Sequence, residues 1–148
     1  MSDDAKLGPS APLVIPQPVP NPDNAGFWDG CRQHVLCLQS CVRCGAVRHP
    51  PRPACPHCLS FDGEWRRASG RGVVYTFTIV HGPTLAVFQE QAPYNVVVVQ
   101  LAEGPFMVSV LIDTPADRIT IGMPVEVVFD DVSDTVTLPK FRPVVRQA

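Results

Sequence analysis

Residues 41–58 read CVRCGAVRHPPRPACPHC and contain two CxxC pairs with ten residues between Cys44 and Cys55. Two residues between paired cysteines allow both thiolates of one tight turn to face the same ion. The intervening loop brings the second turn opposite the first and completes a tetrahedron of sulfur ligands. The sequence therefore predicts one structural zinc ion bound by Cys41, Cys44, Cys55 and Cys58.

Two other interpretations of the CxxC pairs are less favoured. A redox dithiol of the thioredoxin type belongs at the start of a helix in a βαβ unit, and no such unit is predicted here. A catalytic zinc needs an open position for water, which four protein ligands do not leave. Gly45 follows the first pair directly and supplies the backbone freedom that such a turn demands.

Four further side chains in this region are not expected to bind the metal. Cys31 and Cys37 lie outside the CxxC pattern, and we expect both to be buried thiols on the apolar face of a helix. His49 and His57 would replace a ligand only if a cysteine were displaced. We expect both histidines to be solvated.

From Gly72 onward the sequence has the pattern of β-strands. The runs GVVYTFTIVH, YNVVVVQL, PFMVSVLI, VEVVF and TVTL are rich in Val, Ile, Thr and aromatic residues, and Gly, Pro, Asp or Asn separate them. Five or six short strands at this spacing predict a small antiparallel barrel of OB type. The uninterrupted apolar stretch 96–99 predicts a central strand that is buried on both faces.

The first 22 residues include six prolines, which predict an extended arm because proline neither donates a backbone hydrogen bond nor continues a helix. The arm is either a free tail or a segment that docks on a partner, and apolar residues such as Ile15 and Val19 favour docking. Next, Phe27 and Trp28 begin an apolar pattern of helical spacing. This aromatic pair either covers the ribbon or faces a partner.

The predicted protein is thus mostly β. A proline-rich arm covers residues 1–22 and a short helical segment covers 23–40. A rubredoxin-like zinc ribbon covers 41–67, and an OB-fold barrel with a C-terminal tail covers 68–148. The start of the sequence lacks the basic-then-apolar order of a secretory signal, and no apolar run approaches 18 residues, so we expect a cytoplasmic protein without membrane contact.

Charge is distributed unevenly along the chain. Residues 32–71 hold seven arginines and two acids, whereas residues 72–148 hold four basic and eight acidic residues. The basic ribbon segment is therefore the expected place for a phosphate-bearing ligand. There is no GxSxG, no HExxH and no glycine-rich phosphate loop, so the sequence does not predict catalysis by this chain. His81, at the end of a strand, is most simply a surface histidine.

Single-stranded nucleic acid is an alternative ligand, because zinc ribbons and OB barrels both bind it. The net acidic charge of the barrel argues against this ligand, since stacking platforms normally lie in a basic groove. The aromatic residues of the barrel lie mostly among apolar neighbours in the sequence, and core packing accounts for them. They are Tyr75, Phe77, Phe88, Tyr94, Phe106 and Phe129.

The order of these features resembles that of the zinc-ribbon and OB-fold proteins known as domain of unknown function 35. The resemblance covers about residues 24–130 and rests on FWDG, the two CxxC pairs, the PPR after the first pair, the junction from Trp65 to Gly72 and the ending GMPVEVVF. Family members that this sequence resembles are acyl-CoA-associated proteins, often small non-catalytic subunits of thiolase-superfamily complexes. The catalytic Cys and His of such complexes lie on the thiolase-like chain.

The resemblance implies an accessory subunit that docks on a thiolase-like partner and shapes or holds its acyl-donor site. The expected contacts with the phosphates of coenzyme A are Arg43, Arg48, Arg52, Arg66 and Arg67, and the pantetheine arm would pass Phe77, His81 and Tyr94. The expected partner interface comprises Ile15, Val19, Phe27 and Trp28. The alternative for the arginines is ordinary surface pairing, and a stand-alone acyl-CoA-binding protein is a further alternative function.

Overall fold

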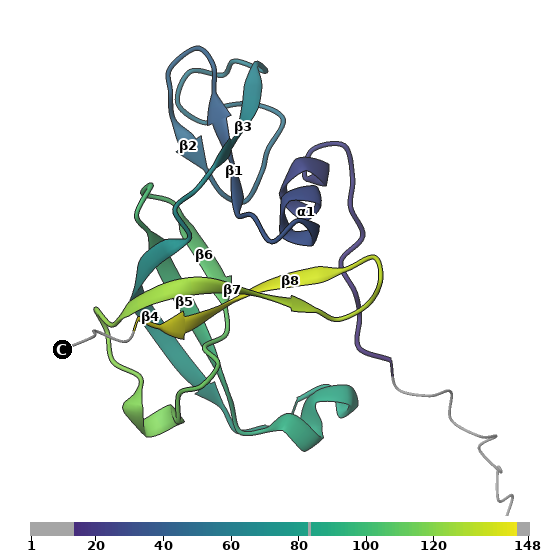
Figure 1. Ribbon diagram of the computed structural model, residues 1–148, viewed down its shortest axis with the longest axis vertical. Coiled ribbons are helices and arrows are strands. Elements are labelled where there is room, and N and C mark those ends of the chain that lie inside the picture. Colours follow the sequence, from purple (N-terminus) through teal and green to yellow (C-terminus); the bar gives the residue numbers. More distant parts are fainter. Residues whose placement is uncertain (1–13, 83, 145–148) are drawn as a thin grey trace, which may run out of the picture.

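The computed structural model describes residues 14–82 and 84–144 of the 148-residue chain. Helix α1 (Ala25–Arg32) is followed by a small three-stranded sheet and then by a larger five-stranded sheet. Figure 1 shows the small sheet and α1 at one end of the molecule and the curled larger sheet at the other. This mostly β arrangement confirms the predicted fold class.

Helix α1 is shorter than the predicted helical segment, which extended over residues 23–40. Phe27 and Cys31, one turn apart, are buried, and the chain leaves the helix through His34, whose backbone is left-handed with φ of 56°. Leu36 and Leu38 are then buried at alternate positions. This period of two is that of a strand, so their apolar spacing belongs to the sheet and not to the helix.

The small sheet is the zinc ribbon, with strand order β2-β1-β3. Strand β1 (Cys37–Cys41) pairs with β2 (Val47–Arg48) on one side and with β3 (Gly63–Arg67) on the other, both antiparallel. The ribbon therefore begins at residue 37, and Cys37 lies on a strand rather than on the predicted helix.

The large sheet has the strand order β6-β5-β4-β7-β8. The strands are β4 (Arg71–Val80), β5 (Tyr94–Leu101), β6 (Phe106–Ser109), β7 (Pro124–Asp131) and β8 (Thr137–Pro143), with 3-10 helices η1 (Ala86–Gln91) and η2 (Ala116–Arg118) between them. Closure into a barrel comes from a parallel bridge between Leu111 and Phe141. Five strands in this order, closed at this point, form an OB fold.

One hydrophobic core extends from the barrel to α1. It contains Phe141, Val74, Val97, Val99 and Leu101 of the barrel together with Phe27, Leu36 and Leu38. The barrel and the ribbon are thus packed through a shared apolar contact rather than joined by a free linker.

Two expectations about the barrel are wrong. Val97 and Val99 are fully buried but Val96 and Val98 are half-buried, so β5 is completely buried on one face. Tyr75 and Phe106 are exposed and stack edge to face, with ring centroids 4.8 Å apart. A bulge in β4 between Val74 and Thr76 interrupts the alternating pattern at Tyr75, which is why its exposure could not be inferred from its apolar neighbours.

Within the part of the chain that the structure describes, no helix is both long and apolar enough to cross a membrane.

Candidate functional site

The four predicted ligands converge at one point of the ribbon. The Sγ atoms of Cys41, Cys44, Cys55 and Cys58 all lie within 4.8 Å of one another. Cys41 Sγ lies 3.5 Å from Cys58 Sγ, and Cys44 Sγ lies 3.6 Å from Cys55 Sγ. Sulfurs about 2.3 Å from a central zinc in a tetrahedron would be about 3.8 Å apart, so the donor set fits a single zinc ion.

The two knuckles, residues 41–46 and 55–60, have the same backbone hydrogen bonds. Gly45 donates its N–H to the carbonyl of Cys41 at 2.8 Å, and Leu59 donates to that of Cys55 at 2.9 Å. Backbone N–H groups also point at the sulfurs: the N–H of Cys44 lowers the pKa of Cys41, and the N–H of Cys58 lowers that of Cys55 to about 6. The turns therefore stabilise the thiolates of Cys41 and Cys55, the form that binds metal, whereas desolvation and the neighbouring thiols raise the pKa of Cys44 to about 12.

The metal centre is structural in character. Four cysteines occupy the four positions of a tetrahedral zinc, so none remains for water or substrate. Cys31, completely buried in α1, lies outside this cluster, and burial raises the pKa of its thiol to about 12. It is an inert core thiol, as predicted.

Of the predicted phosphate contacts, Arg48 is held inside the ribbon. Its side chain is 6% exposed, and its guanidinium donates to the side chain of Gln39 at 2.7 Å and to the carbonyl of Arg52 at 3.2 Å. Arg48 thus serves to connect β1, β2 and the following loop. Arg66 is exposed but paired with Glu64.

The remaining arginines are accessible. Arg43, Arg52 and Arg67 are exposed, and among the described residues none of them forms an ion pair. They are the arginines of the predicted set whose guanidinium groups remain available to an anionic ligand.

A cleft of about 450 Å³ lies where α1, the loop after β2 and the barrel strands β6 and β8 meet. Its walls are mostly apolar, with Trp28 on one side and Met107 and Leu138 on the other. The polar side chains that line it include Asn24, His49 and Lys140. An apolar cleft between two modules with a few convergent polar groups is a typical ligand-binding location.

His49 is not solvated, contrary to expectation. Its ring lies 5.1 Å from that of Phe27, and burial lowers its pKa to about 4, so that the imidazole is neutral near neutral pH. Its Nδ1 atom is buried without a hydrogen-bond partner. Pro50 and Pro51, which follow His49, also line the cleft, and no sequence pattern marked His49 as buried.

A second cleft, of about 440 Å³, adjoins the first, because both are lined by Val110, Leu138 and Lys140. The arm segment 15–18 and Tyr94 contribute to its walls, and the Tyr94 hydroxyl lies 3.3 Å from that of Thr84. Phe77 packs against the core and His81 is exposed, and neither lines these two clefts. The predicted set Phe77, His81 and Tyr94 is therefore not gathered in one place.

The residues predicted to form the partner interface differ in their exposure. Phe27 is 5% exposed and belongs to the core, which excludes it from a partner surface. Trp28 is half-buried in the wall of the first cleft. Ile15 and Val19 on the arm are exposed, with Ile15 also lining the second cleft.

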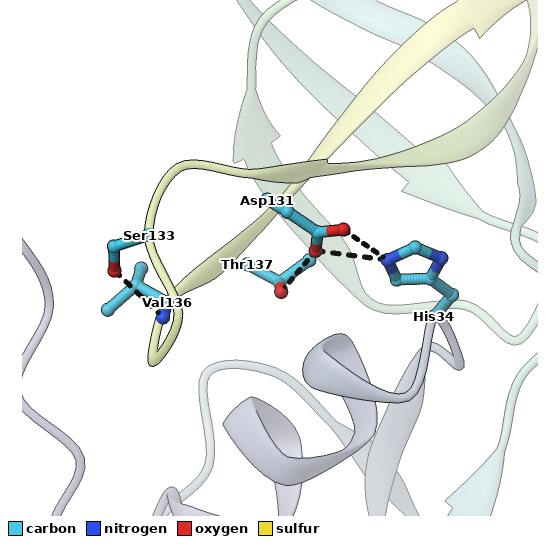
Figure 2. Close-up of polar contacts among 5 residues, drawn as sticks. All are labelled: His34, Asp131, Ser133, Val136 and Thr137. Carbon is cyan, nitrogen blue, oxygen red and sulfur yellow. Dashed lines mark hydrogen bonds and ion pairs between the residues drawn. The ribbon is translucent and has the colours of Figure 1, made fainter.

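A polar connection that the sequence did not predict joins the two modules. His34 follows α1, and its Nε2 lies 3.0 Å from each carboxylate oxygen of Asp131 at the end of β7 (Figure 2). Thr137 donates its hydroxyl to the same carboxylate at 2.6 Å, and this bond, followed by that of His34, lowers the pKa of Asp131. The His34 ring also stacks on Phe129.

These features define a class of protein: a rubredoxin-like zinc ribbon packed on a five-stranded OB barrel. The model of the ChsH2 rubredoxin-like zinc ribbon domain matches residues 28–63, and that of the ChsH2 C-terminal OB-fold domain matches residues 65–130. A DUF35 domain-containing scaffold protein of Pyrococcus furiosus is 34% identical over 126 residues, covering 81% of this chain and 92% of that protein. The chain belongs to the DUF35 family of zinc-ribbon and OB-fold proteins.

Two longer relatives carry enzyme names. A probable enoyl-CoA hydratase alpha subunit of Thermomonospora curvata is 42% identical over 132 residues, 89% of this chain. The 3-oxo-4,17-pregnadiene-20-carboxyl-CoA hydratase alpha subunit of Mycobacterium tuberculosis is 34% identical over 123 residues, 83% of this chain. The chain spans 41% and 39% of the lengths of these two relatives.

Solved structures share the fold. A chain of an Ltp2-ChsH2(DUF35) aldolase superposes with a TM-score of 0.79 at 41% identity, covering 87% of this chain and 100% of that one. A DUF35-family protein of Sulfolobus solfataricus superposes with a TM-score of 0.59 at 16% identity, over 83% of this chain and 86% of that one. The second likeness concerns the fold alone.

Proposed function

We propose that the chain is a non-catalytic accessory subunit of a cytoplasmic complex that forms or cleaves carbon–carbon bonds, or transfers acyl groups, next to an acyl-CoA thioester. A thiolase-like subunit would carry the catalytic residues, and this chain would help to shape or hold the acyl-donor site. The observation that carries the proposal is the match to the full length of a chain in an Ltp2-ChsH2(DUF35) aldolase.

The chemistry of the chain itself supports a non-catalytic role. The tetrathiolate site leaves no coordination position for a substrate. The His34–Asp131 pair is an exposed contact between the end of α1 and β7, and the Asp131 carboxylate also accepts a hydrogen bond from Thr137. These groups provide structural contacts rather than a reaction centre.

The acyl donor would meet the chain at two kinds of surface. The exposed guanidinium groups of Arg52 and Arg67 suit the phosphates of coenzyme A, and Arg66 would have to exchange its partner Glu64. The pantetheine arm is narrow and weakly polar, which suits the apolar clefts beside Trp28 and Tyr94.

Co-expression of the full chain with a thiolase-like subunit, where one is encoded beside its gene, tests the proposal. We expect a stable hetero-oligomer with acyl-transfer or carbon–carbon lyase activity, and little activity or solubility for either subunit alone. An active monomer of this chain, or failure of the two chains to associate, would overturn the proposal. Calorimetric titration of the isolated chain with CoA thioesters would identify a stand-alone acyl-CoA-binding protein instead.

Single-stranded nucleic acid stays the second candidate because of one observation, the exposed Tyr75–Phe106 ring pair on strands β4 and β6 of the OB barrel. Exposed aromatic rings on an OB fold can stack on bases. A gel shift with single-stranded oligonucleotides that weakens steeply with salt and disappears in Tyr75→Ala would support this alternative.

A further inference from the structure

Three large apolar side chains are exposed beside the metal centre. Val42 is 60% exposed, Leu59 is 74% exposed and Phe61 is 78% exposed. The N–H of Val42 donates to the carbonyl of Asp62 at 3.0 Å, which joins the first knuckle to the segment after the second. We call these three residues the knuckle face.

The end of the ribbon at which β1 ends and β3 begins lies away from the barrel (Figure 1). Cys41 pairs with Gly63 at one end of β1, whereas Cys37 pairs with Arg67 at the other end, from which the chain continues into β4. From residue 41 to residue 62 the buried residues are Cys41, Arg48, Cys55 and Ser60. None of these is aliphatic or aromatic, so the knuckle face covers no core of its own.

Leu59 has an unfavourable backbone conformation as well as an exposed side chain. It follows the second CxxC pair as Gly45 follows the first, and both N–H groups bond to the carbonyl of the first cysteine of their pair. Both residues are left-handed, with φ of 75° at Gly45 and 59° at Leu59. Glycine adopts this conformation without steric cost, whereas leucine does not. Folding of the ribbon therefore favours glycine at position 59, and the leucine side chain is 74% exposed and outside the hydrophobic core of the described residues.

The charge beside the knuckle face indicates what could cover it. Arg43 lies between the two cysteines of the first knuckle, is exposed, and forms no ion pair with any residue in 14–82 or 84–144. The nearby Asp62 accepts a hydrogen bond from Ser60. The accessory role proposed above supplies one definite occupant for this surface, the catalytic subunit. A different protein with an apolar recess and a carboxylate at its edge would match both the side chains and the charge.

We propose that Val42, Leu59 and Phe61 form the docking face for the catalytic subunit, with Arg43 paired to a carboxylate of that subunit. This inference rests on the function proposed above and names the surface through which it operates. The zinc ion then has a definite task, which is to hold two short loops in register so that three apolar side chains meet the partner together.

Leu59→Gly and Phe61→Ser test the proposal in the complete heteromer. Leu59→Gly relieves the backbone conformation, so we expect full zinc content and an unchanged or higher melting temperature. Its affinity for the catalytic subunit, measured by dilution of the co-expressed heteromer, should nevertheless fall by at least about tenfold, because a few anchor residues carry most of the binding energy of an interface. Phe61→Ser should weaken binding similarly. Arg43→Glu should weaken binding more than Arg43→Ala, which separates charge pairing from packing.

Ile121→Ser is the matched control, since Ile121 is 71% exposed on the barrel and lies outside the knuckle face. It should bind as the wild type does. If Leu59→Gly and Phe61→Ser bind within about twofold of the wild type, the docking face is wrong although the proposed function stands. If the wild-type chain forms no complex at all, both proposals fall. Heteromer formation could instead be unchanged in these variants while they lose self-association or binding to phosphatidylserine vesicles. Either result would overturn the assignment of the catalytic subunit as the occupant.

Discussion

The zinc end of the ribbon and the barrel are stabilised in different ways. The barrel buries large apolar side chains such as Val74, Leu101 and Phe141 in a continuous core. Between residues 41 and 62 the buried residues are two cysteines, an arginine and a serine, and strand β3 is exposed along its whole length. The barrel therefore folds by burying apolar surface, whereas the knuckles depend on the metal ion for their stability.

Removal of the metal should have the largest effect, because it should unfold the zinc end of the ribbon and leave the barrel folded. A strong chelator, or Cys55→Ser with Cys58→Ser, should unfold the knuckles, because apparent binding free energies of structural zinc are on the order of 10 kcal/mol. We expect backbone amide NMR signals of residues 41–63 to lose dispersion while those of β4, β5 and β7 keep theirs. Simultaneous loss of both sets would show that the two regions are a single cooperative unit.

Phe141→Ala should destabilise the barrel while leaving the metal site intact. Phe141 is completely buried in the barrel, and its truncation should lower the free energy of unfolding by about 3–5 kcal/mol. Zinc content, measured with a colorimetric chelator under native conditions, should stay at one ion per chain. Val108→Ala, at an exposed position of the same sheet, is the control and should change stability by less than about 0.5 kcal/mol.

Acidification tests the cleft between the two regions through His49. Burial lowers the pKa of this imidazole from 6.5 to about 4, so the unfolded chain takes up a proton before the folded chain does. Stability should therefore fall as the pH decreases from about 6.5 to about 4, by roughly 3 kcal/mol in all. His49→Gln should remove this dependence, and the exposed His57→Gln should keep it. An unchanged slope in His49→Gln would mean that His49 is not buried in solution.

The smallest expected effect concerns the contact between His34 and Asp131. The pKa of Asp131 is lowered, first by the hydroxyl of Thr137 and then by His34, so its contribution to stability is present above the ordinary value of 3.8. It is lost as the pH falls through the lower value of the folded protein. Asp131→Asn should thus lower the melting temperature slightly at neutral pH and not at pH 2, whereas the exposed Asp134→Asn should change it at neither. A deficit that persists at pH 2 would point to a loss of packing.

Much of the fold could be predicted, because it depends on patterns that are local in sequence. The CxxC spacing, with its short turns, predicted the metal ligands, and the alternating apolar runs predicted an OB barrel. The helix boundary was wrong because Leu36 and Leu38 fit a helix and a strand equally well over so few residues. Tyr75 was assigned to the core because its neighbours in the sequence are apolar. That assignment was wrong because the bulge in β4 changes the side of the strand on which residues lie, and composition does not reveal a bulge.

The candidate site was predicted less well, because it depends on contacts between residues far apart in sequence. The sequence predicted Arg48 as a surface cation, but its guanidinium is bonded to Gln39, and it predicted His49 as solvated, but the imidazole is buried beside Phe27. His34 and Asp131 lie 97 residues apart, and no sequence pattern connects them.

The sequence by itself determined the metal-binding chemistry of this protein, because two CxxC turns carry nearly all the geometry that a zinc ion requires. Only the tertiary structure decided which of its arginines, histidines and aromatic side chains are available to a ligand or a partner. Burial and pairing are properties of the packed molecule, and the same residue type lies in the core at Phe27 and in solvent at Phe61.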